Sequence, residues 1–323
     1  MTPQAGRATD LSLDKPRRWC PFVPMRPRFL LPWLAAGLWP AALGAREPAA
    51  DLKPLVPEAA TPMAKVGPSR GGDLLFYLPT HDKPATPATW GFRFEPVDFD
   101  STDGTKLHGW FLPARGERLG TVVFSHGNAG SVGHHLGFIL WLVEAGYQVL
   151  TFDYRGYGES AGSPDRRGMV EDVKSAFRYA SARSDVDPTR LVSYGHSLGG
   201  AKSVAALGET RVPGLRAVVV DGTFASYRAM ARQMAGRLGE SLVTDDLAPE
   251  KLIARISPVP LLVIHGGNDP VVPISQGRRL FDAAHEPKTF FEVRSGGHGD
   301  SLARDRGAYR KRLLDWLAGS LGG

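Results

Sequence analysis

The most constraining feature of this chain is a serine between two glycines, in the segment Gly195-His196-Ser197-Leu198-Gly199. A short apolar run, Leu191 to Tyr194, precedes the segment, and a stretch of small residues follows it. This order predicts a strand, a sharp turn and a helix, with the serine at the apex of the turn. The serine would need a strained backbone there, and flanking glycines leave room where larger side chains would clash.

A serine hydroxyl is a poor nucleophile at neutral pH, so a reactive Ser197 needs a base and an acid that orients the base. The apolar run 260–264 predicts a buried strand, and Asp269 lies in the loop that follows it. The run 288–293 predicts the next strand, and His298 lies in the glycine-rich loop after it. Open α/β sheets place their sites at the carboxyl ends of parallel strands. We therefore predict Ser197 as the nucleophile, His298 as the base and Asp269 as the acid.

Other polar residues lie close to these loops in the sequence. Asp221 also follows an apolar run and is the alternative acid, whereas Asp300 is expected to cap its own loop or helix. His196 lies inside the turn, so its ring should point away from the serine, and His265 is expected to satisfy backbone groups. Arg155, in a glycine-containing loop after another strand, is expected to brace carboxylates and the shape of that loop.

Attack on a carbonyl creates a negatively charged oxygen, which needs donors that are already in place. One predicted donor is the backbone N–H of Leu198, the residue after the nucleophile. The second should come from the loop 126–130, which follows a predicted strand at 121–124 and contains two glycines. The backbone of either Asn128 or Ala129 could supply it, and we favour Asn128.

Predicted strands and helices alternate along most of the chain. The runs 92–100 and 106–112 predict an antiparallel pair, because a turn-forming segment joins them. The later alternation predicts parallel strands with helices on both faces of the sheet. We therefore predict an α/β fold with a mainly parallel eight-stranded sheet. The other strands are expected at 121–125, 148–152, 191–194, 217–220, 260–265 and 288–293, with helices near 132–145, 168–184, 198 onward and 301–317.

The stretch 222–257 is longer than a simple connection between two strands. Its apolar residues recur at roughly helical spacing, which predicts a small helical cap that lines the site. A single crossover helix with a loop is the alternative, and either arrangement leaves the site fairly open. The apolar residues concerned are Met230, Met234, Leu238, Leu242, Val243 and Leu247.

The first 45 residues predict a signal peptide. The stretch 29–43 is apolar and uncharged, Arg26 and Arg28 precede it, and small residues follow it up to Ala45. It is shorter than the roughly 20 residues of a membrane span. A start at Met25 would give the leader an ordinary length. We expect an exported protein, periplasmic or secreted; the alternatives are an uncleaved segment that anchors the chain in a membrane and a disordered front.

Composition bears on the linker, the cysteine chemistry and the partners of the chain. Residues 46–90 begin rich in proline and alanine and predict a linker and N-terminal extension before a main domain at 91–320. The only cysteine is Cys20, upstream of Met25, so a processed chain would have no thiol. Residues 1–45 hold six basic and two acidic residues, a net +4, which leaves +2 of the total of +6 for the rest. We expect no nucleic-acid partner, no metal and no cofactor.

Several motifs occur together and in one order. This combination resembles α/β-hydrolases of the serine-aminopeptidase-like class, near the depalmitoylating α/β-hydrolase-domain proteins, over about residues 90–320. The resemblance implies an α/β-hydrolase fold and implies Ser197, Asp269 and His298 as the triad. Members often carry Asn after the Gly-His of the last motif, where this chain has Gly299. The motifs are His126-Gly127-Asn128-Ala129-Gly130, Asp153-Tyr154-Arg155-Gly156-Tyr157-Gly158-Glu159-Ser160, Gly195-His196-Ser197-Leu198-Gly199-Gly200, the Asp269 loop and Gly297-His298.

These residues predict a serine hydrolase that forms an acyl-enzyme on carboxylic esters or thioesters of small to medium size. A peptidase that uses the same residues is the alternative enzyme, and a non-catalytic binding protein on the same fold is the alternative from another class. A dehalogenase is disfavoured, because a serine rather than an aspartate occupies the turn. The expected partner is a small ester or acyl substrate, with membrane contact only through an uncleaved N-terminal segment.

Overall fold

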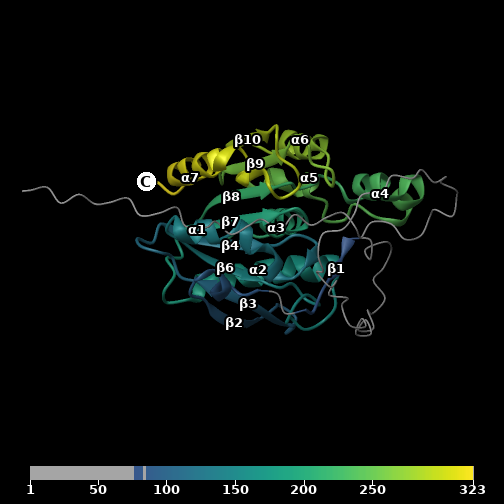
Figure 1. Cartoon of the computed structure of the whole chain (residues 1–323). Helices are drawn as coiled ribbons and strands as arrows, with labels where there is room; N and C mark the ends of the chain where they lie inside the picture. The colour runs from purple at the N-terminus through teal and green to yellow at the C-terminus, as the bar shows by residue number, and fades with distance from the viewer. Residues whose placement is uncertain (1–75, 83–84, 323) are drawn as a thin grey trace, which may run out of the picture.

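The computed structural model of the chain describes residues 76–82 and 85–322 (Figure 1). The predicted signal peptide, Cys20 and most of the predicted linker lie outside these residues. Among the described residues, no helix is both long enough and apolar enough to cross a membrane.

An eight-stranded sheet forms the centre of the molecule, in the order β10-β9-β8-β7-β4-β6-β3-β2 (Figure 1). Strand β3 pairs antiparallel with β2 and β6, and the other neighbouring strands pair in parallel. The predicted mainly parallel sheet is therefore confirmed. The strands are β2 (Glu95–Asp100), β3 (Lys106–Leu112), β4 (Gly120–Ser125), β6 (Tyr147–Phe152), β7 (Leu191–His196), β8 (Leu215–Asp221), β9 (Leu261–Gly266) and β10 (Lys288–Val293).

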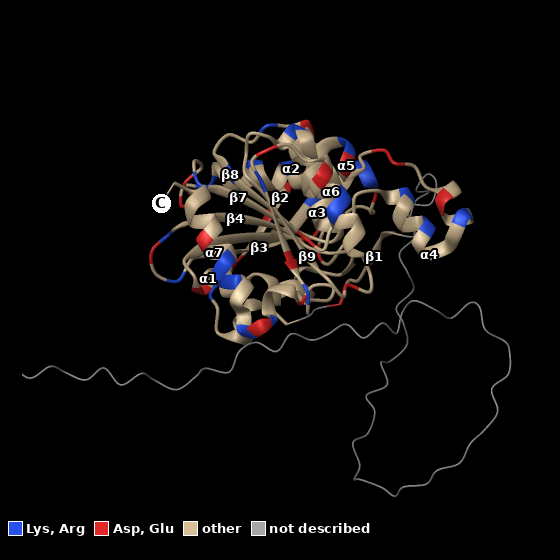
Figure 2. Ribbon diagram, turned by 90° about the horizontal axis from the view of Figure 1, so that it is seen from above, with Lys and Arg blue, Asp and Glu red and all other residues tan. Residues whose placement is uncertain are grey.

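Helices cover both faces of the sheet, so its central strands are buried on both sides. Every residue of β4, β6, β7 and β9 is buried, which explains why these strands are almost continuously apolar in the sequence. One face packs against α2 (Arg166–Ala182), α3 (Leu198–Glu209) and α6 (Ile274–Ala283). The other face packs against α1 (Leu140–Glu144) and α7 (Ala308–Ser320), and Figure 2 shows the strands between the two layers.

Two predicted helices are shorter than expected. The stretch predicted as one helix at 132–145 is a 3₁₀ helix, η3 (Val132–Phe138), followed by the single short helix α1. Two glycines in η3 weaken an α-helix there. The final helix was expected from residue 301, but two 3₁₀ turns, η5 (Ser301–Ala303) and η6 (Asp305–Gly307), come first. Gly307 has φ 77°, which interrupts a continuous helix before α7 begins.

The segment after β8 projects from the body of the molecule. It contains α4 (Tyr227–Leu242), α5 (Pro249–Leu252) and η4 (Ile253–Ile256), and α4 extends away from the sheet in both views (Figures 1 and 2). Gly236, with φ 63° and ψ −154°, divides α4 into two parts. Of its predicted apolar residues, Met230 is buried, whereas Leu238 is 70% exposed. The exposed face of α4 therefore does not pack against the core.

A short segment before the sheet packs against the loop that follows β4. Phe76 and Tyr77 are buried in the core. They lead into β1 (Leu78–Pro79), which pairs in parallel with β5 (Ala129–Gly130), and 3₁₀ helix η2 (Pro87–Trp90) precedes β2. The last residues of the predicted extension are thus part of the packed domain.

Candidate active site

Ser197 occupies the turn between β7 and α3 in a strained conformation. Its φ is 53° and its ψ is −119°, values that residues with a side chain rarely adopt. Its backbone N–H donates to the carbonyl oxygen of Asp221 at 2.8 Å, which ties the turn to the neighbouring strand. A Cβ atom on Gly199 would lie 2.0 Å from the carbonyl oxygen of Ser125, so that position admits only glycine. Close packing therefore explains the glycine of the predicted turn.

The structure brings the three predicted residues together in one hydrogen-bonded chain. The Oγ atom of Ser197 lies 3.0 Å from Nε2 of His298, and Nδ1 of His298 lies 2.8 Å from Oδ2 of Asp269. Ser197 and His298 are 101 residues apart in the sequence. The Asp269 side chain is fully buried and that of His298 is 18% exposed, so the chain runs from the interior toward solvent.

Asp269 is fixed by its own loop. Its Oδ1 atom accepts hydrogen bonds from the backbone N–H groups of Val271 and Val272 at 2.9 and 2.8 Å. These two bonds fix the orientation of the carboxylate, so that Oδ2 faces His298. His265 lies behind this loop, and its Nε2 atom is 2.8 Å from the carbonyl oxygen of Val272. The expectation that His265 satisfies a backbone group is confirmed.

Asp221, the alternative acid, lies at the end of the strand next to the serine. Its side chain is buried and accepts a hydrogen bond from the hydroxyl of Tyr194 at 3.2 Å. Burial raises its pKa to about 7. The carboxylate that contacts His298 is therefore that of Asp269, and the contribution of Asp221 to the turn is its backbone oxygen.

The two predicted oxyanion donors lie on adjacent segments. Leu198 is the first residue of α3, so its N–H has no acceptor within the helix, and the helix N-terminus favours negative charge. The loop after β4 packs beside the turn, because a Cβ on Gly127 would lie 3.1 Å from the ring of His196. Asn128 follows in that loop, and its side-chain Oδ1 accepts hydrogen bonds from the N–H of Leu78 and the hydroxyl of Tyr157. These two contacts could not be predicted, because Leu78 and Tyr157 lie tens of residues away from Asn128 in the chain.

His196 contacts the site more closely than the sequence suggested. Its Nδ1 atom lies 3.1 Å from the carbonyl oxygen of Asp221, so this nitrogen does not face the serine. Its ring lies between those of Phe138 and His298, with centroids 4.3 and 4.8 Å away. Burial lowers the pKa of His196 well below its ordinary value, so the ring beside His298 is neutral.

The residue after His298 is a glycine with a positive φ. Gly299 has φ 86°, a conformation that glycine and asparagine tolerate best. A Cβ there would lie 2.9 Å from the ring of Phe138. Asp300 accepts a hydrogen bond from the N–H of Gly297 at 2.7 Å, which confirms its expected role in the local loop.

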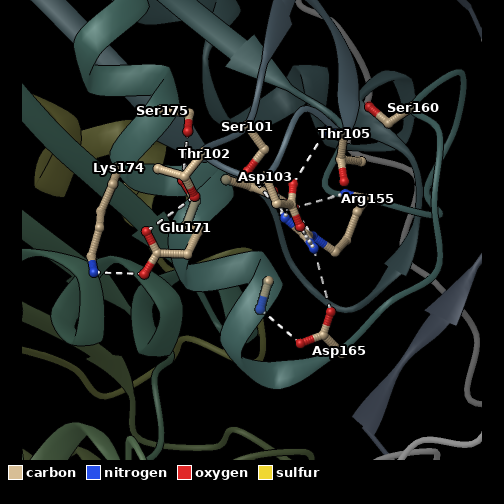
Figure 3. Close-up of polar contacts among 12 residues, drawn as sticks. Ser101, Thr102, Asp103, Thr105, Arg155, Ser160, Asp165, Glu171, Lys174 and Ser175 are labelled. Atoms are coloured by element: carbon tan, nitrogen blue, oxygen red, sulfur yellow. Dashed lines mark hydrogen bonds and ion pairs between the residues drawn. The ribbon is translucent and has the colours of Figure 1, made fainter.

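Arg155 holds the loop after β6 in place (Figure 3). Its guanidinium bonds to Asp172 at 2.8 Å and to Asp103 at 2.8 Å. Asp172 is fully buried and also accepts from the hydroxyl of Ser101. The expectation that Arg155 braces carboxylates is confirmed, although its partners on β2–β3 and α2 could not be named from the sequence.

The sheet order, with a strained serine between β7 and α3, defines the protein as an α/β-hydrolase. The chain belongs to the serine aminopeptidase S33 family, whose pattern it matches over residues 116–244. This confirms the resemblance inferred from the motifs. Among residues 76–82 and 85–322, no three His, Cys, Asp or Glu side chains are grouped so that they could hold a metal ion.

Comparison with known proteins gives relatives in bacteria and animals. The chain is 39% identical to the uncharacterized protein YfhR of Escherichia coli (strain K12) over 76% of this chain and 87% of YfhR. It is 32% identical to the lysophosphatidylserine lipase ABHD12 of Gallus gallus, over 56% of this chain and 51% of that protein. Its fold is similar to that of the Pyrococcus furiosus esterase Pf2001, with a TM-score of 0.63, 18% identity, and coverage of 75% of this chain and 97% of the esterase.

Proposed function

We propose that this protein is a serine hydrolase that cleaves carboxylic esters or thioesters through an acyl-enzyme. The observation that carries the proposal is the hydrogen-bonded chain from Ser197 through His298 to Asp269. In the first step His298 takes the hydroxyl proton at Nε2 while Oγ of Ser197 attacks the substrate carbonyl. Asp269 holds the Nδ1–H of His298, which fixes the tautomer and stabilises the imidazolium that forms.

The negative charge of the tetrahedral intermediate falls on the former carbonyl oxygen. We assign its stabilisation to the backbone N–H groups of Leu198 and Asn128. His298 then returns the proton to the leaving alcohol or thiol, and the acyl group remains on Ser197. A water molecule attacks this acyl-enzyme, with His298 again as the base, and the acid product leaves.

Exposed apolar side chains next to the site, Leu78 and Val271, support an acyl substrate. Five large apolar side chains are strongly exposed in the described part of the chain, and they lie on β1, on α4 and in the loop after β9. Leu78 bonds through its N–H to the side chain of Asn128, and Val271 lies two residues after Asp269. Gln233 of α4 donates to the carbonyl oxygen of Val271 at 3.4 Å, which places the part of α4 just before Gly236 beside the acid loop. The five residues are Leu78, Met234, Leu238, Leu242 and Val271.

The names of the compared proteins are consistent with this substrate class. One is an esterase, and another is a lipase that acts on a lysophospholipid. On this support we assign an ester or thioester with an apolar acyl group to this chain. A series of p-nitrophenyl esters of increasing acyl length would define the preferred chain length.

Replacement of Ser197 by Ala tests the proposal directly. Turnover of p-nitrophenyl butyrate should fall by about 10⁴-fold or more, because the nucleophile is lost. Wild type, but not Ser197→Ala, should be labelled covalently by a fluorophosphonate probe. Ser241→Ala is the matched control, since Ser241 is exposed on α4 and bonds only within that helix. Turnover by Ser197→Ala equal to that of the wild type would exclude this mechanism.

A peptidase is the second candidate, because the matching family is described as serine aminopeptidase. The same nucleophile, base and acid would serve, and an amine would leave instead of an alcohol. Aminoacyl p-nitroanilides separate the two functions. Hydrolysis of p-nitrophenyl esters without release of p-nitroaniline would assign the protein to the esterases.

We also propose that the protein is exported. The support is the apolar stretch 29–43 with preceding arginines and following small residues. Fractionation of cells that express the full chain would test this, with the N-terminal sequence of the exported form as the readout. Full-length protein confined to the cytosol would contradict the proposal.

A further inference from the structure

The side chain of Asn128 lies at the centre of a contact between three segments. Its loop joins β4 to β5. The Oδ1 atom accepts from the N–H of Leu78 at 3.0 Å and from the hydroxyl of Tyr157 at 3.1 Å. A carbonyl oxygen has two lone pairs, so these two bonds saturate it. Because a backbone N–H can only donate, the oxygen and not the amide nitrogen must face Leu78.

The hydroxyl of Tyr157 acts as a hydrogen-bond donor to Asn128. Its side chain is fully buried, and its ring lies 5.4 Å from that of His126 and 5.8 Å from that of Tyr154. Burial raises its pKa well above the ordinary value, so the hydroxyl keeps its proton. Tyr154 donates to the carbonyl oxygen of His126 at 3.0 Å, so two tyrosines of the loop after β6 hold the loop after β4.

The segment around β1 ties the same two loops together. The register of β1 pairs Leu78 with Ala129 and Pro79 with Gly130. Thr80 donates through its N–H to Gly130 at 3.2 Å and accepts from the N–H of Gly158 at 2.9 Å. Figure 1 shows β1 at the side of the molecule to which α4 also extends. A segment that precedes the family match at residue 116 therefore fixes the loop that carries Asn128.

We propose that the carboxamide oxygen of Asn128 is a positioning group for the reaction: through Leu78 and Tyr157 it holds the backbone N–H groups of its loop toward the oxyanion. This inference rests on the proposed serine hydrolase function. A displacement of about 1 Å at such a site can cost about a hundredfold in rate, because the donors must meet the charge as it develops. The substrate itself would touch the backbone of the loop and not this oxygen.

Two variants of the full chain test the proposal. Asn128→Leu removes the acceptor at similar size, and Tyr157→Phe removes one donor and keeps the ring. We expect kcat per active site, counted by fluorophosphonate titration, to fall about tenfold to a hundredfold in Asn128→Leu and less in Tyr157→Phe, with KM little changed. Affinity for a trifluoromethyl ketone, which forms a tetrahedral adduct on the serine, should fall in parallel. Tyr179→Phe removes a hydroxyl that bonds to Arg183, remote from this loop, and should leave both values unchanged.

A pair of variants at Leu78 tests the contribution of its backbone N–H. Leu78→Pro removes the N–H, whereas Leu78→Ala keeps it, so kcat should be lower in the proline variant than in the alanine variant. A purely structural role would lower the melting temperature and the number of titratable sites without changing kcat per site or ketone affinity. That result in Asn128→Leu and Tyr157→Phe, with an active wild type, would overturn this inference alone. A wild type that neither hydrolyses esters nor reacts with fluorophosphonate would overturn the proposed function together with it.

Discussion

The Nδ1 atom of His298 lies 2.8 Å from Oδ2 of Asp269, although the neighbouring strand β8 ends in a second aspartate, Asp221. Both carboxyl groups are buried, but their surroundings differ. Asp269 accepts two backbone hydrogen bonds, which hold its carboxylate in place against His298. The Asp221 side chain accepts one bond from a tyrosine, and its pKa is raised to about 7 by burial. The two aspartates are therefore suited to different roles.

Replacement of each aspartate by asparagine should separate these roles. Asp269→Asn should lower kcat for p-nitrophenyl butyrate by about 10⁴-fold, because His298 would lose the partner that fixes its tautomer. Asp221→Asn should lower kcat by less than about tenfold, since its backbone oxygen still holds Ser197. Circular dichroism would check that both variants fold. Equal losses in the two variants would contradict the assignment of Asp269.

Backbone strain at Ser197 should appear in the stability of the protein. We expect Ser197→Gly to have a free energy of unfolding about 1 kcal/mol higher than Ser197→Ala, because glycine accepts φ 53° without strain. Urea denaturation measures the difference. The control is the same pair at Ser203, which lies inside α3. Glycine should be worse than alanine there, by about 1 kcal/mol, so the sign of the difference should reverse. The same sign at both positions would argue against strain at the turn.

Arg155 should contribute to stability through the charge that it compensates. Arg155→Met leaves the fully buried carboxylate of Asp172 without its main partner and should cost about 3–5 kcal/mol of unfolding free energy. Asp172→Asn in the same chain should recover part of this loss. Arg167→Met, which breaks an exposed ion pair between α2 and Glu209 of α3, should cost less than about 1 kcal/mol. Additive losses from the two substitutions at 155 and 172 would mean that the pair is not coupled.

Asp221 should make stability depend on pH. Its pKa is about 7 in the folded chain against an ordinary value of 3.8, so the folded state keeps a proton that the unfolded state releases. Its contribution is thus fully present below about pH 4 and is lost as pH rises to about 7. The unfolding free energy of the wild type minus that of Asp221→Asn should fall by up to about 1.4 kcal/mol per pH unit in this range. Histidines that do not interact with Asp221 affect both proteins alike, so they cancel in the difference. Parallel curves from pH 4 to 8 would contradict the raised pKa.

Some parts of the site could be predicted because they are local or follow chain order. The apolar runs that became β7, β9 and β10 were visible, and Ser197, Asp269 and His298 each follow one of them. The extent of the helices was less predictable. The 3₁₀ turns at 132–138 and 301–307 form where glycine, positive φ and packing against neighbours outweigh the apolar pattern. The exposure of Leu238 on α4 was also hidden, because helical spacing does not say whether a face meets the core.

The amino-acid sequence by itself determined the turn around Ser197, since the glycines that permit it are neighbours in the chain and act through short-range sterics. It also determined the family of α/β-hydrolases, through motifs in a fixed order. Only the tertiary structure decided which aspartate contacts His298 and that Asn128 is held by Leu78 and Tyr157. Those contacts join residues tens of positions apart, and their distances depend on the order of strands in the sheet and on the packing of loops at its edge.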